Sequence, residues 1–372
     1  MKLKSSLRIL YIHNANFDKE SANRVQVINM CNSFIKNSRV SLLSLLTTGT
    51  SEKSIRRRYN LSKIVEIYIR KPVNNYYFRS FKLLLHFLRI KSKYNVIYTR
   101  DILVAYMIKM FSKKRYVCYE VHEIRESLLW KFMFRRISRS LDKIIAISYG
   151  LKNELDEKYK LKKDFIDVLP DGVDMDLFYV RNSKKETRDI LDLPDNKKII
   201  LYIGSLQEWK GYRIFLEASN YFKDKKDILF VLVGGTEQMQ SKLKKEFPNV
   251  YFKDNVKSYI VPYYLKTSDL LILPNSSKSK ISTTYTSPLK LFEYMSSETP
   301  LISSNLPSIK EIVSEDEVLF VKPDSSKDLV DKIEYALENY KEMKSKAKKS
   351  YKKVQEYTWK NRVDRLIDII RK

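Results

Sequence analysis

Short apolar runs alternate with amphipathic segments along the whole chain, and this alternation limits the fold more than any other feature. Runs that are apolar throughout are typical of parallel strands buried on both faces. Two series of such runs predict an α/β protein with two doubly wound, Rossmann-like domains. The expected strands are 7–12, 40–46, 64–69, 95–99, 116–120, 143–147 and 165–169, then 199–203, 228–233, 249–252, 269–273, 300–303 and 318–321. The clearest helical patterns are 22–36, 79–92, 212–222, 237–246, 289–296 and 327–339.

A polar stretch at 171–197 separates the two series. It is bordered or interrupted by the turn-forming residues Pro170, Gly172 and Pro194. We therefore expect a first domain over 1–177 and a second over 178–356, followed by a last helix over 357–372. A length of 372 residues suits two such domains.

The net charge of +27 is unevenly distributed, since residues 51–140 hold 22 basic and 6 acidic side chains. Such an excess indicates an anionic partner, namely nucleic acid, anionic lipid or a phosphorylated substrate, although a lysine-rich genome would also produce it. The first apolar run, "LRILYI", is too short for a signal core, and no run has the length of a membrane span. Cys31 and Cys118 read as buried thiols. We expect a cytoplasmic protein, free or peripheral on the inner face of the plasma membrane.

The helix expected at 79–93 combines basic and apolar residues. Its basic stripe comprises Arg79, Lys82, His86, Arg89 and Lys93, and its apolar face comprises Phe81, Leu84, Leu85 and Leu88. Such a helix can lie on an anionic membrane. The alternative is a core-packed helix with a solvated basic face.

Three loops of the second series are candidates for a phosphate site, because ligands of doubly wound sheets bind where strands end. "GSLQEWKG" follows 199–203 and offers Gly204, Lys210 and Gly211, and "GGTEQ" follows 228–233 and includes Gly235. The third loop runs from Pro274 to Lys290. In it we expect Ser287 as the N-cap of the next helix and Pro288 at its first position.

Glu293 lies in an otherwise apolar segment, "LKLFEYM". It follows Lys290 at i+3, on the same side of a helix. A carboxylate can accept two hydrogen bonds from the vicinal diol of a ribose while the lysine holds the adjoining phosphates. The alternative is a surface ion pair on an amphipathic helix.

Four motifs occur together in one order: "IIAISYGLKNEL…VLPDGVDMDLF", "LYIGSLQEWKGYRIFLEAS", "DLLILPN" and "SPLKLFEYMSSETPLISS". In sequence and spacing they resemble the family-4 (group 1) glycosyltransferases of the GT-B fold, most strongly over 143–313. The resemblance implies two Rossmann-like domains that face a cleft, with a C-terminal helix crossing back to the first domain. It also implies a retaining transfer from a nucleotide sugar.

Carried over residue by residue, the resemblance gives Glu293 the donor ribose and Lys210 the diphosphate. Leu289 and its neighbours match the loop whose amides meet the phosphates, and Asp171 and Gly172 match the interdomain loop. Trp359 matches the tryptophan before the C-terminal helix. The full set of expected donor-binding residues is Gly204, Ser205, Lys210, Gly235, Pro274, Ser287, Leu289, Lys290 and Glu293.

The chain departs from the family pattern at two positions. Tyr285 stands where a second glutamate is common, and Ser205 stands where an arginine often follows the glycine. Either activity is altered, or Lys290 supplies the missing charge, which is the interpretation we favour.

The first domain is expected to bind the acceptor. The candidates follow its strands and are Asn16, Asn23, Arg100, His122 and Glu123. His122 resembles the histidine that many family members keep near the transferred sugar, so we place it with Lys210 and Glu293 as catalytic. A structural histidine is the alternative.

The sequence thus predicts a metal-independent retaining glycosyltransferase without a cofactor, since no carboxylate cluster has ligand spacing. Its donor would be a UDP- or GDP-sugar, and its acceptor a glycan or lipid-linked glycan for cell-surface polysaccharide or glycoconjugate synthesis. Two alternatives remain. A basic nucleic-acid-binding protein would explain the charge but not Glu293, and no nucleic-acid motif is recognised. A nucleotide-sugar epimerase on the same fold would convert the donor without an acceptor.

Overall fold

The computed structural model describes residues 6–18, 21–112, 115–162 and 164–372. Its contacts divide the chain into two units. The first unit consists of residues up to Asp171 together with Trp359–Lys372, and the second is Gly172–Thr358. The sequence placed the corresponding bounds at 177 and 356. The helix that begins at Trp359 belongs to the first unit, as the family resemblance implied.

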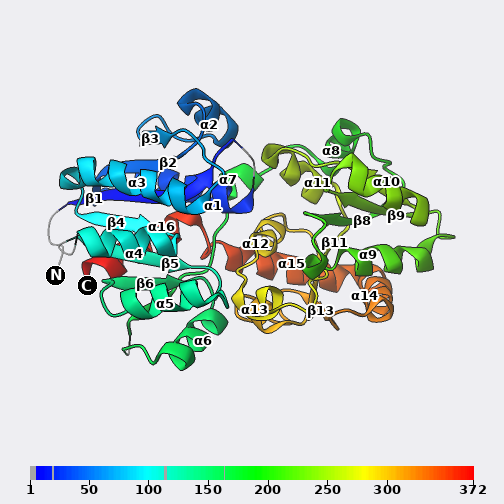
Figure 1. The fold of residues 1–372 in the computed structure, drawn as a ribbon. Helices are drawn as coiled ribbons and strands as arrows, with labels where there is room; N and C mark the ends of the chain where they lie inside the picture. Colours follow the sequence, from blue (N-terminus) through cyan, green and yellow to red (C-terminus); the bar gives the residue numbers. More distant parts are fainter. Residues whose placement is uncertain (1–5, 19–20, 113–114, 163) are drawn as a thin grey trace. The chain divides into compact units, whose positions relative to one another are not determined.

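The first unit contains a seven-stranded parallel sheet in the order β3-β2-β1-β4-β5-β6-β7 (Figure 1). Its strands are β1 (Leu7–Asn16), β2 (Val40–Thr48), β3 (Glu66–Arg70), β4 (Val96–Thr99), β5 (Tyr116–Val121), β6 (Lys143–Ala146) and β7 (Ile166–Val168). Strands β1, β4 and β5 are buried over nearly their whole length, which is why they read as continuous apolar runs.

The helices of the first unit lie on both faces of this sheet. They are α1 (Ala22–Phe34), α2 (Glu52–Tyr59), α3 (Tyr76–Ile90), α4 (Ile102–Phe111), α5 (Leu128–Ile137), α6 (Tyr149–Tyr159) and α16 (Trp359–Arg371). After β3 the chain returns to the other side of β1 and adds β4 to β7 there. Right-handed crossovers therefore place α3 to α6 on the face opposite α1 and α2. Helix α16 packs on α1, and α4 packs between α3 and α5.

The second unit contains a six-stranded parallel sheet in the order β10-β9-β8-β11-β12-β13. The strands are β8 (Lys198–Ile203), β9 (Ile228–Val233), β10 (Val250–Lys253), β11 (Leu270–Leu273), β12 (Leu301–Ser304) and β13 (Leu319–Val321). The α-helices are α7 (Met175–Phe178), α8 (Lys184–Leu191), α9 (Tyr212–Ser219), α10 (Glu237–Glu246), α11 (Val261–Thr267), α12 (Leu289–Met295), α13 (Pro307–Lys310), α14 (Ser326–Glu338) and α15 (Tyr340–Val354). Successive residues of each strand enter opposite cores, with Leu201 and Ile203 in one and Ile200 and Tyr202 in the other.

The predicted fold class is confirmed, and every expected strand is present within a few residues of its predicted bounds. The prediction of a continuous loop from Pro274 to Lys290 is partly wrong, because Ile281–Tyr285 forms a π-helical turn (η5). In the described residues, no helix combines the length and hydropathy needed to cross a membrane.

The predicted faces of the helix at 79–93 are also wrong in part. The buried residues of α3 are Ser80, Leu83, Leu84 and Phe87. Phe81 and Leu85, expected inside, are exposed. Arg79 and His86, expected in solvent, turn towards the protein, since Arg79 donates to Asn14 and to the Val73 carbonyl and His86 pairs with Arg70.

Candidate functional site

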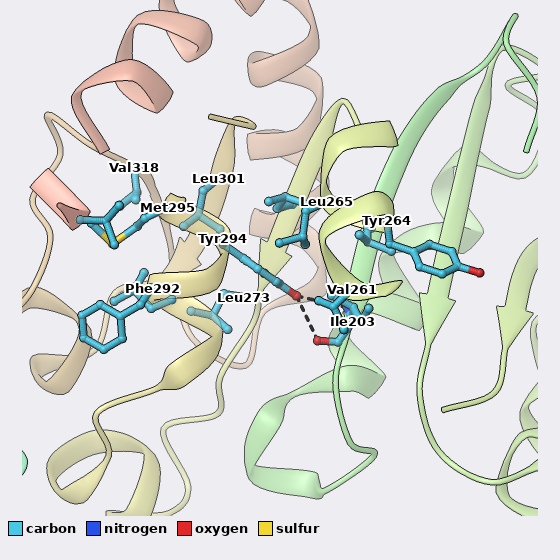
Figure 2. Packing of buried hydrophobic residues seen from close by; sticks show 14 of the residues in the cluster. Ile203, Val261, Tyr264, Leu265, Leu273, Phe292, Tyr294, Met295, Leu301 and Val318 are labelled. Carbon is cyan, nitrogen blue, oxygen red and sulfur yellow. Dashed lines mark hydrogen bonds between the residues drawn. The ribbon is translucent and has the colours of Figure 1, made fainter. Parts of the chain in front are cut away.

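Helix α12 is fixed to the sheet of the second unit by its buried side. Leu291, Phe292, Tyr294 and Met295 all lie in the core. The Tyr294 hydroxyl accepts from the Ile203 amide at 3.1 Å and donates to its carbonyl at 3.2 Å. Figure 2 shows this side chain reaching the end of β8. The helix therefore has a defined rotation, which leaves its other face to polar side chains.

Lys290 and Glu293 occupy that other face. Lys290 Nζ lies 2.7 Å from Glu293 Oε2, and the two side chains are 26% and 22% exposed. Lys210, in the single turn η2 (Glu208–Lys210) after β8, completes the cluster. Burial and the nearby Lys290 charge lower the pKa of Lys210 to about 8, against an opposing effect of Glu293. Two lysines and one carboxylate thus leave an excess of positive charge, which suits the binding of an anion.

Glycines allow the backbones around Lys210 to approach closely. Gly211 has a φ of 67°, and a Cβ there would lie 1.7 Å from the Pro274 carbonyl oxygen. A Cβ on Gly234 would lie 1.8 Å from the Gly204 carbonyl oxygen. Gly235, with a φ of 80°, packs against the Leu206 side chain. The loops after β8, β9 and β11 therefore meet at one edge of the sheet, as the sequence predicted.

The segment that leads into α12 is held against the Lys210 turn. The Ser276 amide donates to the Trp209 carbonyl at 2.9 Å. Ser287 is buried, but the predicted cap is wrong, because Pro288 takes the N-cap position and no side chain caps α12. Leu289 is the first residue of α12. Pro288 contributes a fixed φ of −73° but no hydrogen-bond acceptor in its side chain, so its side chain cannot accept from the first amides of α12.

The two departures from the family pattern lie in different surroundings. Tyr285 is buried in the π-helical turn. Ser205 is exposed, and its hydroxyl lies 3.4 Å from the Gln207 amide oxygen. Neither brings a charge to the cluster, whose positive charges come from Lys210 and Lys290.

A second polar cluster, which was not predicted from the sequence, surrounds Glu120 of β5 in the first unit. Glu120 is fully buried and accepts hydrogen bonds from Arg362 Nη2 at 2.8 Å and Gln26 Nε2 at 3.1 Å. The Tyr98 hydroxyl also donates to it. Arg362 belongs to α16, so a carboxylate in the middle of the sheet and a guanidinium far along the chain satisfy each other.

His122 follows β5 and lies beside Glu120. Its Nε2 is 2.6 Å from Glu120 Oε1, and Arg100 Nε is 3.6 Å from the same oxygen. Burial opposes ionisation of Glu120, but Arg362, His122 and Arg100 outweigh it and hold the Glu120 pKa well below its usual range. Burial, together with Arg100, lowers the pKa of His122 to about 4. His122 is therefore neutral at pH 7, and its contact with the Glu120 carboxylate places the proton on Nε2 and leaves Nδ1 as a hydrogen-bond acceptor.

The structure brings together some of the predicted acceptor residues. The Asn23 carbonyl accepts from Arg100 Nη1 at 3.1 Å, so Asn23, Arg100 and His122 are linked through the Glu120 cluster. Asn16 instead holds the turn after β1, where its side chain accepts from the Asp18 amide at 3.0 Å. Glu123 pairs with Arg125 at 2.6 Å.

Asp171 and His13 add two buried polar groups to the first unit. Gln26 donates to Asp171, and burial raises the Asp171 pKa to about 7 against the opposing charge of Arg362. Gly172 begins the second unit. His13 is 7% exposed, and neither ring nitrogen has a hydrogen-bond partner among the described residues. His13 lies within β1, and its place directly after the apolar run 7–12 was the signal in the sequence that could have marked it.

Metal-ligating side chains do not cluster in the described part of the chain, where no group of three His, Cys, Asp or Glu residues has suitable geometry. Both cysteines are free and buried, as expected. The positive charges found at the strand ends are those of lysine and arginine side chains.

Comparison with curated proteins gives relatives named for sugar transfer. The teichuronic acid biosynthesis glycosyltransferase TuaH of Bacillus subtilis is 27% identical over 233 residues, which is 60% of this chain and 56% of that protein. N,N'-diacetylbacillosaminyl-diphospho-undecaprenol alpha-1,3-N-acetylgalactosaminyltransferase of Campylobacter jejuni is 30% identical over 167 residues, 44% of this chain and 42% of that protein. The matches span about half the length of these relatives.

Solved structures share the fold over almost the whole chain. Anabaena HepE in complex with UDP and glucose has a TM-score of 0.74 and 15% identity, with 97% of this chain and 98% of that chain covered. A glycosyltransferase from Rickettsia africae has a TM-score of 0.76 and 16% identity, with 98% of both chains covered. At such identities the likeness shows the fold alone.

Two family matches follow the division of the chain. Residues 25–177 match Glycosyltransferase Family 4, and residues 183–354 match Glycosyl transferases group 1. The first match begins within α1 and leaves out β1, and the second runs from the residue before α8 to the end of α15. The chain belongs to the family-4 (group 1) glycosyltransferases of the GT-B fold.

Proposed function

We propose that the protein transfers a sugar, with retention, from a nucleoside-diphosphate sugar to a glycan or lipid-linked glycan in cell-surface polysaccharide or glycoconjugate synthesis. The observation that carries the proposal is the cluster of Lys210, Lys290 and Glu293 at the strand ends of the second unit. It is supported by relatives named for teichuronic acid synthesis and for a diphospho-undecaprenol acceptor. The neighbour that holds UDP and glucose supports the donor class.

The chemistry of the cluster fits a diphosphate leaving group. Lys210 and Lys290 offer positive charge where charge develops as the sugar leaves, in a partly buried site where such charges are effective. Glu293 offers two acceptor oxygens to a vicinal diol, one of which is now occupied by Lys290. Donor binding would free that oxygen as Lys290 turns to the phosphates. We propose that these lysines, without a metal ion or cofactor, neutralise the diphosphate.

The first unit would hold the acceptor at the ends of β1, β4 and β5. His122, with Nε2 held by Glu120, has Nδ1 available for an acceptor hydroxyl. Arg100 and Asn23 belong to the same cluster, while Asn16, which holds the turn after β1, and Glu123, which pairs with Arg125, are further candidates. The roles of these residues rest on the proposed activity.

Glu293→Ala tests the donor site directly. We expect nucleotide-sugar binding to weaken by about 1.5–3 kcal/mol, the range for hydrogen bonds to a charged group. A thermal-shift panel of UDP-, GDP- and ADP-sugars identifies the donor, and calorimetry then measures the affinity. Glu334→Ala, an exposed glutamate on α14, is the matched control. Unchanged donor affinity in a folded Glu293→Ala protein would remove Glu293 from the site.

Lys290→Ala tests whether this lysine replaces the arginine common after Gly204. We expect turnover to fall severalfold more than in Lys348→Ala, which changes an exposed lysine of α15. The double variant Lys290→Ala/Ser205→Arg should recover part of the loss, because Ser205 is exposed beside Gly204. Product formation is measured with the donor from the panel, with and without EDTA. Wild-type turnover in Lys290→Ala would show that the positive charge on the diphosphate comes from another residue. Loss of wild-type turnover in EDTA would contradict metal independence.

A further inference from the structure

Three neighbouring helices of the first unit expose large apolar side chains. Helices α3, α4 and α5 lie next to one another over one face of the seven-stranded sheet (Figure 1). The exposed residues are Tyr77, Phe78, Phe81 and Leu85 on α3, Met110 and Phe111 on α4, and Leu128, Leu129 and Phe132 on α5. Leu128 is 85% exposed. Single exposed apolar residues are ordinary, but a group spread over three adjacent helices indicates an interaction surface.

Basic side chains are interspersed with these apolar residues. Lys82 and Arg89 lie on α3, Arg135 and Arg136 on α5, and Arg139 just after it, all of them exposed or partly exposed. Lys82 Nζ lies 5.0 Å from the centre of the Phe78 ring. None of the three helices contains an acidic residue. We call these nine apolar and five basic residues the apolar–basic surface.

The composition of this surface identifies its partner by charge and by chemistry. Its basic residues call for an anionic partner, and its apolar residues call for one that also offers hydrocarbon. An anionic lipid bilayer offers both, because side chains such as Phe and Leu enter the acyl boundary while Lys and Arg remain among the headgroups. We propose that the apolar–basic surface docks the protein on an anionic membrane, with Phe78, Phe81, Leu85, Leu128 and Phe132 inserted into the interface.

Two other partners fit the surface less well. Single-stranded nucleic acid stacks its bases on aromatic rings, but the aliphatic residues Leu85, Met110 and Leu128 offer no ring for stacking. A second copy of the chain would bring the same patch against itself in a two-fold dimer. Because the patch has basic residues and no acidic ones, its own charge opposes that contact. The bilayer therefore remains the partner that satisfies both halves of the surface.

The proposal differs from purely electrostatic attraction in its dependence on salt. Exposed charges are screened over roughly 10 Å at 0.1 M salt, so added salt weakens the basic contribution. Apolar insertion is not screened. We therefore expect anionic vesicles to retain part of the bound protein at high salt, whereas neutral vesicles retain little at any salt.

Flotation with vesicles tests the surface and separates its two contributions. The full-length protein is floated with vesicles of phosphatidylcholine alone or mixed with phosphatidylglycerol. Each Lys or Arg near an anionic leaflet contributes about fivefold to partitioning, so Lys82→Glu/Arg89→Glu should lower it at least ~25-fold. Phe78→Ser/Phe81→Ser/Leu85→Ser should abolish the binding that remains at high salt. The matched control is Tyr221→Ser/Lys223→Glu/Lys226→Glu, which changes exposed residues of the second unit and should float like wild type.

A fluorescent probe reports insertion itself. Phe81→Trp should shift its emission to the blue on addition of anionic vesicles and be quenched by brominated acyl chains. Equal flotation with neutral and anionic vesicles, or wild-type flotation of both multiple variants, would overturn the proposal. So would a concentration-dependent dimer, or tight binding of single-stranded RNA, that the Phe78/Phe81/Leu85 variant abolishes. Sugar transfer is measured with a water-soluble acceptor, so loss of docking and loss of the proposed activity are separate results.

Discussion

At the scale of single residues, the donor site depends on shared charge. Glu293 has a partner of its own in Lys290, whereas Lys210 is held near both without a carboxylate to itself. The pKa of Lys210 is therefore lower in the free protein than in water, and we expect a bound anion to raise it. The Lys290–Glu293 spacing was visible in the sequence because it is local. The approach of Lys210 to this pair was known only through the family resemblance.

Donor affinity should depend on pH through Lys210. In the free protein this lysine loses its proton as the pH rises through about 8, below its ordinary value of 10.5. A bound diphosphate stabilises the ammonium and raises that pKa, so binding takes up a proton and weakens as the pH rises above about 8. Calorimetry in buffers of different ionisation enthalpy measures the uptake. In Lys210→Arg the charge persists, so the affinity should change little between about pH 7.5 and 9.5; an equally flat profile in wild type would contradict the argument.

At the scale of elements, the sequence pattern predicted the positions of the strands better than it predicted which faces of the helices are buried. The strands were found because burial on both faces makes them apolar throughout. The exposed side of α3 was not found, because Arg79 and His86 are held by Asn14 and Arg70 from other strands and loops. The cluster at Glu120 was missed for the same reason: its partner Arg362 comes from a helix distant in sequence.

The position of α12 should depend on the Tyr294 hydroxyl. Tyr294→Phe removes both hydrogen bonds to Ile203 and leaves a buried amide without this partner. We expect a loss of about 1–3 kcal/mol in the free energy of unfolding of the second unit, measured by urea denaturation. Donor affinity should fall as well, because Lys290 and Glu293 stand on the same helix. Tyr221→Phe, at an exposed position, serves as the control and should change neither quantity.

At the scale of the whole molecule, the two units differ in how the chain builds them. The second unit is one continuous segment with its own sheet and two cores. The first unit is discontinuous, since it includes α16, whose Arg362, Val363, Leu366 and Ile367 are buried. The sequence indicated a final helix without a strand, but only the family resemblance assigned it to the first unit.

The segment 172–358 should therefore fold alone and bind the donor with nearly the affinity of the full chain. Its core and all of Lys210, Lys290 and Glu293 lie within it. The segment 1–171 should be strongly destabilised, because Glu120 would lose Arg362, and removing one partner of a buried ion pair costs about 3–5 kcal/mol. Circular dichroism and calorimetry on the two segments check both expectations. An unfolded 172–358, or a 1–171 as stable as the first unit of the full chain, would contradict this division.

The discontinuity of the first unit has a consequence for the order of events on the ribosome. Domains usually fold as they emerge, the N-terminal one first. Here residues 6–171 leave the exit tunnel long before Arg362 is translated, so the Glu120 carboxylate waits without its guanidinium while the second unit is completed. The first unit of the chain therefore cannot be completed until its last helix has been translated. Until then, the first unit exposes the apolar side chains of α3 to α5 and also lacks α16, which packs on α1. We expect chaperones to shield the most apolar surface of the nascent chain during this interval.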